Sequence, residues 1–480
     1  MPDLPQAKIK HIVVLMLENR AFDHLFGFRT GVAGLTGQES NLLDPSAPQS
    51  LSNPPFTVGT GAPYAISVGQ GPGHSVKQTN TQLFGTSAAG GAPSNDGFVK
   101  SYQTELTIAD HVRSPSNGDL AAVMKSFAPA QLPTINALAD QFALCDHWFA
   151  EVPGPTQPNR LYLHAATSDG HALNAWSASF DLRTIYQQIA EAGLSWATYE
   201  HDTNEVRSFI PLQASTAAFK QIGAFAQDCA SGQLANYVFI APRMLADKDG
   251  QMVNSQHAPH DMRWGEHLIA DVYEALRANE AVWQASALIV VYDEHGGFFD
   301  HVAPPAAPNP DNKTSPTVGD PSYAPSFGFD RLGLRVGAVI VSPWVEQGAV
   351  YAAPLQHSSV MKTARELFGI TGNLTQRDAA ASSFAALFSR ETARTDAPAT
   401  LPRPALPDTP APDQAGHPAN QPLDPTQQGL LLGVHHQTRA SHPNDAAELL
   451  PNTQGEASAY IKSRIRQHFG GPAPQNSSAS

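Results

Sequence analysis

The sequence is poor in cysteine, with only Cys145 and Cys229 in 480 residues. Two cysteines exclude a disulfide framework and a zinc site built on several thiolates, although one bridge between them is left open. Charged residues are also scarce, at 15% of the chain, and the acidic ones outnumber the basic ones by 43 to 29. The net charge of −14 argues against a nucleic acid or an anionic bilayer as an unaided partner.

Long apolar runs are missing as well. No segment approaches the roughly 20 apolar residues that a membrane-spanning helix needs. The first residues, MPDLPQAKIKHIVVLMLENR, have a short apolar stretch without a small-residue cleavage site, so we do not expect a signal peptide. We therefore expect a soluble protein, cytoplasmic in the form given, and secreted or periplasmic if a leader has been removed.

What the chain does contain is a series of short apolar runs rich in β-branched residues. The length and composition of four of them are typical of buried parallel strands: KHIVVLML (10–17), NYVFIAP (236–242), ASALIVVYDE (285–294) and GAVIVSPW (337–344). Helical patterns lie between them, at residues 133–149, 182–196 and 264–283. This alternation predicts an α/β fold around a mostly parallel sheet.

Composition divides the chain into three parts. Residues 1–391 are expected to form one large domain, which includes a long stretch rich in Gly, Pro, Ser and Asn at residues 41–97. Residues 392–427 are Pro-rich and predict a linker or a strap across the surface. Residues 428–480 form a tail whose segment EASAYIKSRIRQHF predicts a short helix. Such a helix could lie on a membrane surface, but we expect it to pack back on the core.

Polar groups collect where two of the predicted strands end. Glu18 and Asn19 follow the first strand, and Asp293, Glu294 and His295 follow the third. Adjacent carboxylates repel one another unless a positive group lies between them, and the carboxyl ends of parallel strands meet in one crevice. Two unrelated surface exits are the alternative, but the pair of acidic ends favours a divalent cation site. The two glycines after His295 would let the backbone approach a ligand closely.

A threonine follows a stiff turn in EVPGPTQPNR. Thr156 comes just before a segment with proline near its first helical position, so a plain helix N-cap is one interpretation. The other is that its hydroxyl lies where an anion would bind at a helix N-terminus and, beside a metal ion, acts as a nucleophile toward phosphorus. The chain has 19 histidines, so a single one is weak evidence.

Four motifs together resemble those of a known family. ENRAFDH, TQPNR, HAPHD and DEHGGFFDHV resemble, in order and spacing, the motifs of the phosphoesterase family of bacterial and plant non-specific phospholipases C and acid phosphatases. The resemblance covers about residues 9–369, and it departs at Ala21, where the family more usually has serine. It implies an α/β/α sandwich in three layers, similar to that of alkaline phosphatases and sulfatases.

The resemblance also implies roles for individual residues. Thr156 would be the nucleophile, and His74 and His257 would face the phosphate oxygens and the leaving group. The ligands of one divalent ion, which could be Ca, Zn, Mg or Mn, would be Glu18, Asn19, Thr156, Asp293 and Glu294. The residues expected to support the site are Arg160, His260, His295, His301 and His357.

These roles predict a phosphoric ester hydrolase. We expect a phospholipase C that cleaves phosphatidylcholine-like lipids into diacylglycerol and a phospho-head group through a phosphothreonine intermediate, with transient contact to a membrane or micelle. A phosphomonoesterase of the acid phosphatase type is the main alternative. A non-catalytic phospholipid-binding protein is a third, which the presence of Thr156 disfavours. The sequence leaves the oligomeric state open.

Overall fold

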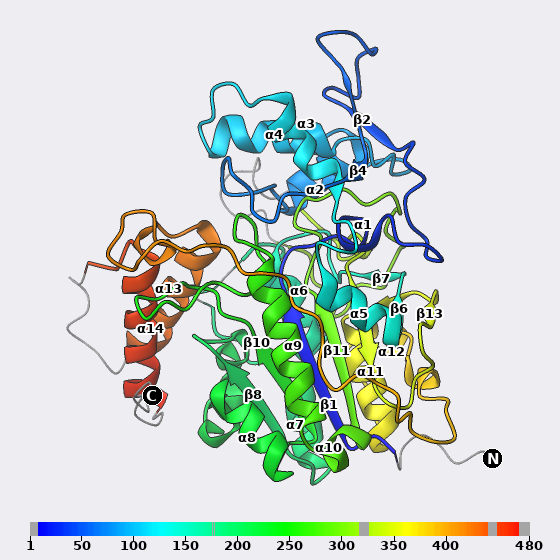
Figure 1. The fold of residues 1–480 in the computed structure, drawn as a ribbon, viewed down its shortest axis with the longest axis vertical. Coiled ribbons are helices and arrows are strands. Elements are labelled where there is room, and N and C mark those ends of the chain that lie inside the picture. Colours follow the sequence, from blue (N-terminus) through cyan, green and yellow to red (C-terminus); the bar gives the residue numbers. More distant parts are fainter. Residues whose placement is uncertain (1–7, 175, 177, 316–325, 440–448, 470–480) are drawn as a thin grey trace.

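The computed structural model describes residues 8–174, 176, 178–315, 326–439 and 449–469. Its centre is a mixed sheet of eight strands in the order β13-β6-β12-β11-β1-β10-β8-β9 (Figure 1). The strands are β13 (Val350–Tyr351), β6 (Ala143–Cys145), β12 (Ala338–Val341), β11 (Ser286–Tyr292), β1 (His11–Leu17), β10 (Tyr237–Ala241), β8 (Trp196–Glu200) and β9 (Phe219–Gln221).

β1 lies in the middle of this sheet and is parallel to both of its neighbours, β10 and β11. Its residues from Ile12 to Leu17 are buried, which explains why the run is apolar without alternation. Leu17 pairs with Tyr292, the last residue of β11, and the backbone N–H of Asp293 donates to the carbonyl of Leu17 at 3.1 Å. The two acidic segments therefore begin side by side, as the sequence predicts.

The fourth predicted strand differs from the prediction in direction. β12 is antiparallel to both β11 and β6, whereas the sequence favoured a parallel strand. β11 is parallel to β1 and follows a helical crossover, but the segment from residue 293 to β12 contains no helix among its described residues. Without a helix to return the chain to the opposite edge, the strand pairs in the reverse sense.

Helices cover both faces of the sheet, which confirms the predicted three-layer α/β/α arrangement (Figure 1). α9 (Arg263–Arg277) packs against α5 (Pro133–Gln141), α8 (Gly223–Ser231) and α10 (Glu280–Gln284). A second group is formed by α6 (Thr156–Ala165), which packs against α7 (Ile185–Glu191) and α11 (Ser358–Phe368), and by α12 (Gln376–Ala380), which packs against α11. The sheet and these helices share one large apolar core.

A lobe with its own small core lies over the carboxyl ends of β1 and β11. It includes much of residues 41–97, the stretch rich in Gly, Pro, Ser and Asn. Its strands and helices are β2 (Ser40–Leu42), β3 (Pro55–Thr57), β4 (Gly59–Thr60), β5 (Lys125–Ser126), α2 (Val76–Phe84), α3 (Phe98–Thr104) and α4 (Asn117–Ala121). α1 (Phe22–Phe26) joins the lobe to β1, and β7 (Trp148–Phe149) pairs with β14 (Leu355–Gln356). The lobe places His74 immediately before α2, over the ends of β1 and β11.

The Pro-rich stretch lies along α9, and two helices follow it. Tyr273 and Arg277 of α9 donate to the carbonyl of Pro398, and Thr134 of α5 donates to that of Pro402. α13 (Pro425–Thr438) and α14 (Gln454–Phe469) then pack against each other beside β10 (Figure 1). The structure thus adds one helix to the predicted tail, and it confirms that the predicted helix packs inward, because Ala457, Ile461 and Ile465 are buried.

The cysteines and the lengths of the helices also relate to the sequence analysis. Cys145 and Cys229 are both buried and free, so the one bridge that the sequence left open does not form. Among the helices of the described segments, none is long and apolar enough to cross a membrane.

Candidate active site

The ends of β1 and β11 are joined through Asp293. Its Oδ1 accepts hydrogen bonds from the backbone N–H groups of Asn19 at 2.9 Å and of Glu294 at 2.7 Å. Asn19 adopts a left-handed conformation with φ of 61°, which turns its N–H toward the neighbouring strand end. Gly296 completes this contact, because a Cβ at that position would lie 2.2 Å from the carbonyl oxygen of Asn19. Gly296 is therefore needed for a close contact between two backbone segments, whereas the predicted approach of the backbone to a ligand stays a prediction.

Four carboxylate oxygens at this point are buried and have no hydrogen-bond partner. They are both oxygens of Glu18, Oδ2 of Asp293 and Oε1 of Glu294, and all three side chains are 0% exposed. Burial raises the pKa values of Glu18 and Asp293 well above their ordinary range, and repulsion adds to this effect, from Asp293 on Glu18 and from Glu294 on Asp293. Burying carboxylates without partners is costly, so the arrangement fits an additional positive group. Oxygen ligands of this kind suit a hard divalent cation.

Arg160 supplies part of the required positive charge. Its Nη1 lies 3.7 Å from Glu18 Oε1 and 3.9 Å from Asp293 Oδ2, so one atom lies near both strand ends. Its Nε is taken by Glu205, at 2.9 Å. One guanidinium thus faces three carboxylates, those of Glu18, Asp293 and Glu205. Because Glu294 adds a fourth carboxylate, the centre keeps an excess of negative charge. Arg160 thus lies where the sequence analysis expects a supporting residue, and it contacts the strand ends through ion pairs.

Thr156 is the first residue of α6, and its side chain does not cap the helix. The N-cap position belongs to Pro155, so the N-cap interpretation of Thr156 is wrong. Its hydroxyl donates instead to Oδ1 of Asn19 at 3.3 Å, and the residue is 0% exposed. The stiff turn of residues 152–155 thus points the hydroxyl at the end of β1, where the unpartnered carboxylates lie.

His74 and His257 lie side by side at the same place, with ring centroids 6.1 Å apart. His74 donates through Nδ1 to the carbonyl of Pro72, so its Nε2 accepts from the amide of Asn19 at 3.2 Å and faces Glu294 Oε1 at 3.7 Å. Both ring nitrogens of His257 are buried without a partner, and burial lowers its pKa to about 4. A buried imidazole with two unpartnered nitrogens fits contact with a ligand.

Two other predicted histidines hold the acidic segment in place. His357 precedes α11, and its Nε2 donates to the backbone carbonyl of Asp293 at 2.6 Å while its Nδ1 accepts from Trp148. Burial lowers the pKa of His357 to about 4, which keeps the ring neutral for this arrangement. His295 lies 3.3 Å from Glu294 Oε2 and 2.7 Å from Gln82 of α2. Both residues support the site without facing its unpartnered oxygens.

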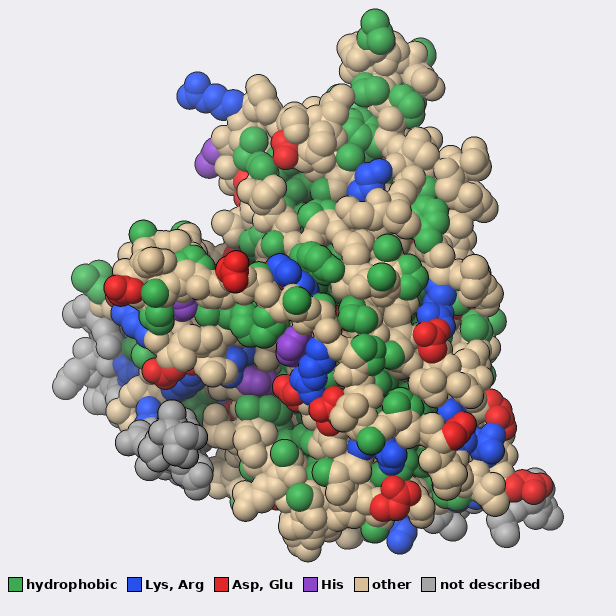
Figure 2. Space-filling model, in the orientation of Figure 1, with side chains coloured by type: hydrophobic (Ala, Val, Ile, Leu, Met, Phe, Trp, Pro, Cys, Tyr) green, Lys and Arg blue, Asp and Glu red, His purple; other side chains and the backbone are tan. Residues whose placement is uncertain are grey.

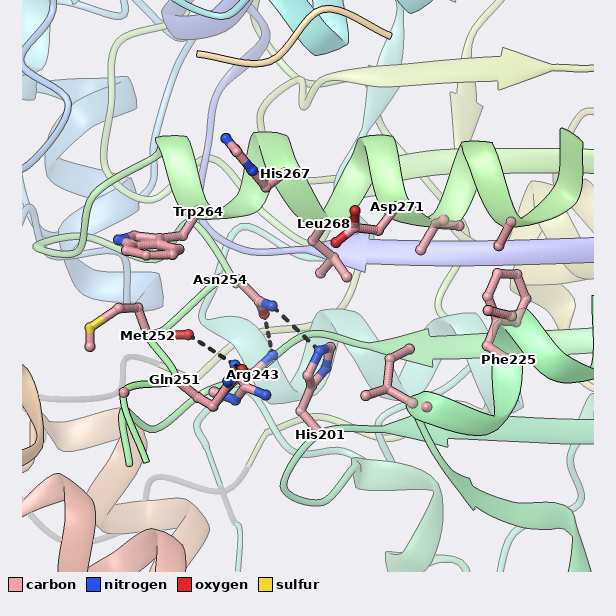
Figure 3. A pocket seen from close by; sticks show the side chains of 16 residues that line it. His201, Phe225, Arg243, Gln251, Met252, Asn254, Trp264, His267, Leu268 and Asp271 are labelled. Carbon is pink, nitrogen blue, oxygen red and sulfur yellow. Dashed lines mark hydrogen bonds between the residues drawn. The ribbon is translucent and has the colours of Figure 1, made fainter. Parts of the chain in front are cut away.

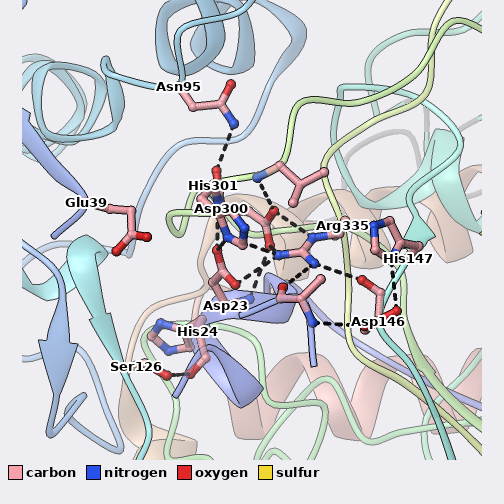
Figure 4. A network of polar contacts seen from close by, with 12 residues as sticks. Asp23, His24, Glu39, Asn95, Ser126, Asp146, His147, Asp300, His301 and Arg335 are labelled. Atoms are coloured by element: carbon pink, nitrogen blue, oxygen red, sulfur yellow. Dashed lines mark hydrogen bonds and ion pairs between the residues drawn. The ribbon is translucent and has the colours of Figure 1, made fainter. Parts of the chain in front are cut away.

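His301 belongs to a different cluster. Asp23, Asp300 and His301 form a group of potential ligand atoms within 4.8 Å of one another (Figure 4). Arg335 already supplies a positive charge to this group, because its guanidinium lies 2.9 Å from each of the two aspartates and is completely buried. Within the described segments, no hydrogen bond of this cluster reaches the five predicted ligands. A neutralised group of this kind suits a structural ion pair better than a cation.

A cavity of about 410 Å³ lies apart from the predicted site. It opens at the ends of β8 and β10 beside α9, with His201, Arg243, Asn254 and Trp264 in its wall (Figure 3). None of the predicted site residues lines it. A second cavity of about 140 Å³ is lined by His260 and by residues of the Pro-rich stretch. The carboxylates of the predicted centre are buried. The side chain of His74, which faces Glu294, is 17% exposed and connects the centre with solvent.

Two residues at the site were not among the candidates that the sequence analysis named. Arg20 is buried with its Nη1 unpartnered and with its guanidinium over Phe298, and burial lowers its pKa to about 10. Asp424 begins α13 and lies 3.6 Å from His260. Arg20 falls within the first motif, but only its burial marks it out. Asp424 lies outside the residues that the motifs cover.

Known proteins resemble the chain over most of its length. The Phosphoesterase family matches residues 9–371. Non-specific phospholipase C1 of Arabidopsis thaliana is 38% identical over 423 residues, which cover 84% of this chain and 75% of that protein. Phospholipase C B of Mycobacterium tuberculosis strain H37Rv is 28% identical over 420 residues, with coverage of 79% and 78%.

A more distant likeness is seen among solved structures. A protein of the alkaline phosphatase superfamily from Vibrio parahaemolyticus is 10% identical, with a TM-score of 0.30 over 52% of this chain and 64% of that one. Membership is established by the sequence, since the family match and the Arabidopsis relative both cover more than two thirds of the chain. The chain therefore belongs to the phosphoesterase family and is a phosphoric ester hydrolase.

Proposed function

We propose that this protein is a phospholipase C that cleaves the bond between glycerol and phosphate in phosphatidylcholine-like lipids. The observation that carries the proposal is the convergence of four unpartnered carboxylate oxygens with Thr156 and His257 at the ends of β1 and β11. The names of the relatives from Arabidopsis thaliana and Mycobacterium tuberculosis support the same activity. Residues 1–391 would form the catalytic domain, residues 392–427 a strap, and residues 428–480 a tail.

In this proposal the cation ligands are Glu18, Asn19, Thr156, Asp293 and Glu294. The excess of buried negative charge at these residues fits a divalent ion. When bound, such an ion lowers the pKa of a hydroxyl group and offsets the negative charge of a phosphate ester.

The side chains of the chain itself divide the remaining work. Thr156 passes its hydroxyl proton to one of the unpartnered carboxylate oxygens and attacks phosphorus in line with the leaving glycerol oxygen, which gives a phosphothreonine and releases diacylglycerol. His257 protonates the leaving oxygen, and His74 faces a non-bridging oxygen. Water then attacks the phosphothreonine, which releases the phospho-head group and restores Thr156. Arg160 and His357 keep the strand ends in position throughout.

A substrate comparison tests this function. Purified protein is incubated with phosphatidylcholine micelles and, separately, with p-nitrophenyl phosphate, each with and without added divalent metal. We expect diacylglycerol from the first substrate at a much higher kcat/KM than nitrophenol from the second. A strong monoesterase without lipid turnover would contradict the proposal and favour an acid phosphatase.

Thr156→Val tests the nucleophile. Valine keeps the shape of threonine and removes the hydroxyl, so we expect kcat to fall at least about 10³-fold, as when other catalytic nucleophiles are removed. Thr134→Val is the matched control, since Thr134 is equally buried but donates to the carbonyl of Pro402 in the strap. Activity of Thr156→Val within a few-fold of the wild type would remove Thr156 from this role.

A further inference from the structure

We propose that Asp424, the residue that begins α13, is a positioning residue for His257 and His260, so that the C-terminal helices form part of the reaction centre. This inference rests on the proposed function of His257. It concerns a residue far beyond the motifs, near the end of the Pro-rich strap, where α13 begins.

Asp424 is held rigidly at the junction between the tail and the catalytic domain. It is 4% exposed, and its Oδ1 caps α13 by accepting from the backbone N–H of Gln427 at 2.8 Å. Its Oδ2 lies 3.6 Å from Nε2 of His260. The side chain of Gln427 donates to the carbonyl of Met244 at 2.8 Å and lies 3.3 Å from the same histidine nitrogen. The start of α13 therefore contacts both ends of the 244–260 segment.

The docking of the two helices is extensive enough to fix this geometry. Met244 and Leu245, which follow β10, join an apolar cluster whose other buried members are Leu423, Leu430, Leu431, Val434, Ala457, Ile461 and Ile465. Polar contacts flank the cluster: the backbone N–H of Ala246 donates to Gln454 at 3.1 Å, and Lys462 lies 2.8 Å from Asp247. In Figure 2, histidine, lysine and arginine side chains gather in the hollow between these helices and the body.

The segment held in this way leads to His257. The backbone N–H of His260 donates to the carbonyl of His257 at 2.9 Å, so a contact with His260 also fixes the backbone of His257. Burial lowers the pKa of His257 most strongly, and His74, His260 and Arg20 lower it further. Asp424 is the charged group that raises it. A carboxylate here stabilises the protonated imidazole that has to donate a proton to the leaving oxygen.

Asp424→Asn tests the charge of Asp424 separately from its role as the N-cap of α13. Asparagine is as good an N-cap as aspartate, so α13 should keep its start. We expect the basic limb of the pH profile of kcat, which reports the protonated histidine, to move to lower pH by about one unit, a tenfold loss at fixed pH on that limb. Asp247→Asn is the matched control, because it removes a contact of the same helices without removing a charge that acts on His257.

Three results would overturn the inference. One is a pH profile of Asp424→Asn that superimposes on that of the wild type. Another is an equal loss of activity in both variants with unshifted profiles, which would mean that the helices only stabilise the fold. The third is an unchanged titration of the His257 ring in Asp424→Asn, followed by NMR without substrate and assigned with His257→Gln. A wild-type enzyme without phosphoester hydrolysis would refute the proposed function, and the NMR titration would still decide the link between Asp424 and His257.

Discussion

Glu18→Gln tests where a cation binds, because Glu18 has two buried oxygens without a hydrogen-bond partner. An ion that binds only the folded state at 100 times its dissociation constant stabilises that state by about 2.7 kcal/mol. With an unfolding entropy of about 2.1 cal/mol/K per residue, a chain of 480 residues loses about 1 kcal/mol of stability per degree near its midpoint. The wild-type melting temperature should therefore rise by about 3 °C.

The variant should lose nearly all of this rise. If removal of the charged ligand weakens binding roughly a hundredfold, the same metal concentration stabilises the variant by only about 0.4 kcal/mol. Without metal, we expect the variant to be at least as stable as the wild type. The folded-state pKa of Glu18 is raised, so its contribution to stability is full below pH 4.5 and is lost as the pH rises toward that folded value. At pH 7, the metal-free variant should melt at or above the wild-type temperature.

Scanning fluorimetry with stripped protein and a series of divalent metals provides the measurement. Asp300→Asn is the matched variant, because Asp300 belongs to the other acidic cluster and pairs with Arg335. Breaking that buried pair should cost about 3–5 kcal/mol of stability but leave the rise with metal intact. If the rise with metal disappears in Asp300→Asn and persists in Glu18→Gln, the cation binds at the Asp23 cluster and the reasoning about Glu18 fails.

Two further predictions concern single residues. Gly296→Ala should lower both activity and melting temperature more than Gly193→Ala does. Both glycines have a positive φ, but only at Gly296 would the new Cβ meet backbone, at 2.2 Å from the carbonyl oxygen of Asn19. Equal effects of the two substitutions would mean that the close contact is unimportant. His301→Gln should be less stable than the wild type below pH 6.5, and this difference in stability should shrink as the pH rises. The reason is that the hydrogen bond to Asp23 raises the pKa of His301. A difference in urea midpoints that does not depend on pH would contradict this prediction.

The sequence predicted the parts of the fold that one strand or one motif determines. The runs at β1, β10 and β11 were assigned correctly, because a strand buried on both faces is continuously apolar. The direction of β12 could not be predicted, since direction depends on the connection and not on the strand. Residues 133–149 form α5 followed by β6 and β7, although their pattern predicted one helix. Short apolar runs fit either structure, and only pairing with β12 and β13 decides.

The candidate site shows the same division. Glu18 and Asp293 were placed together correctly, because parallel neighbours end at the same edge of the sheet. The actual partner of Thr156 was not predicted, since it depends on the φ of Asn19. Asp424 is separated from His257 by more than 160 residues, and nothing in its local pattern distinguishes it from any N-cap aspartate. Only the docking of α13 brings the two residues together.

The Pro-rich strap is bound mostly through its main chain. Side chains of α5 and α9 donate to its carbonyl oxygens, at Ala397, Pro398, Pro402, Pro404 and Ala405. A carbonyl oxygen is the same in every amino acid, so these five contacts depend on the extended backbone and hardly on the identity of the residues that supply the carbonyl oxygens. Exposed strap residues such as Pro402 and Ala405 can therefore change more freely than Arg403, whose guanidinium pairs with Asp271 and Glu274 of α9, or than the buried Leu401.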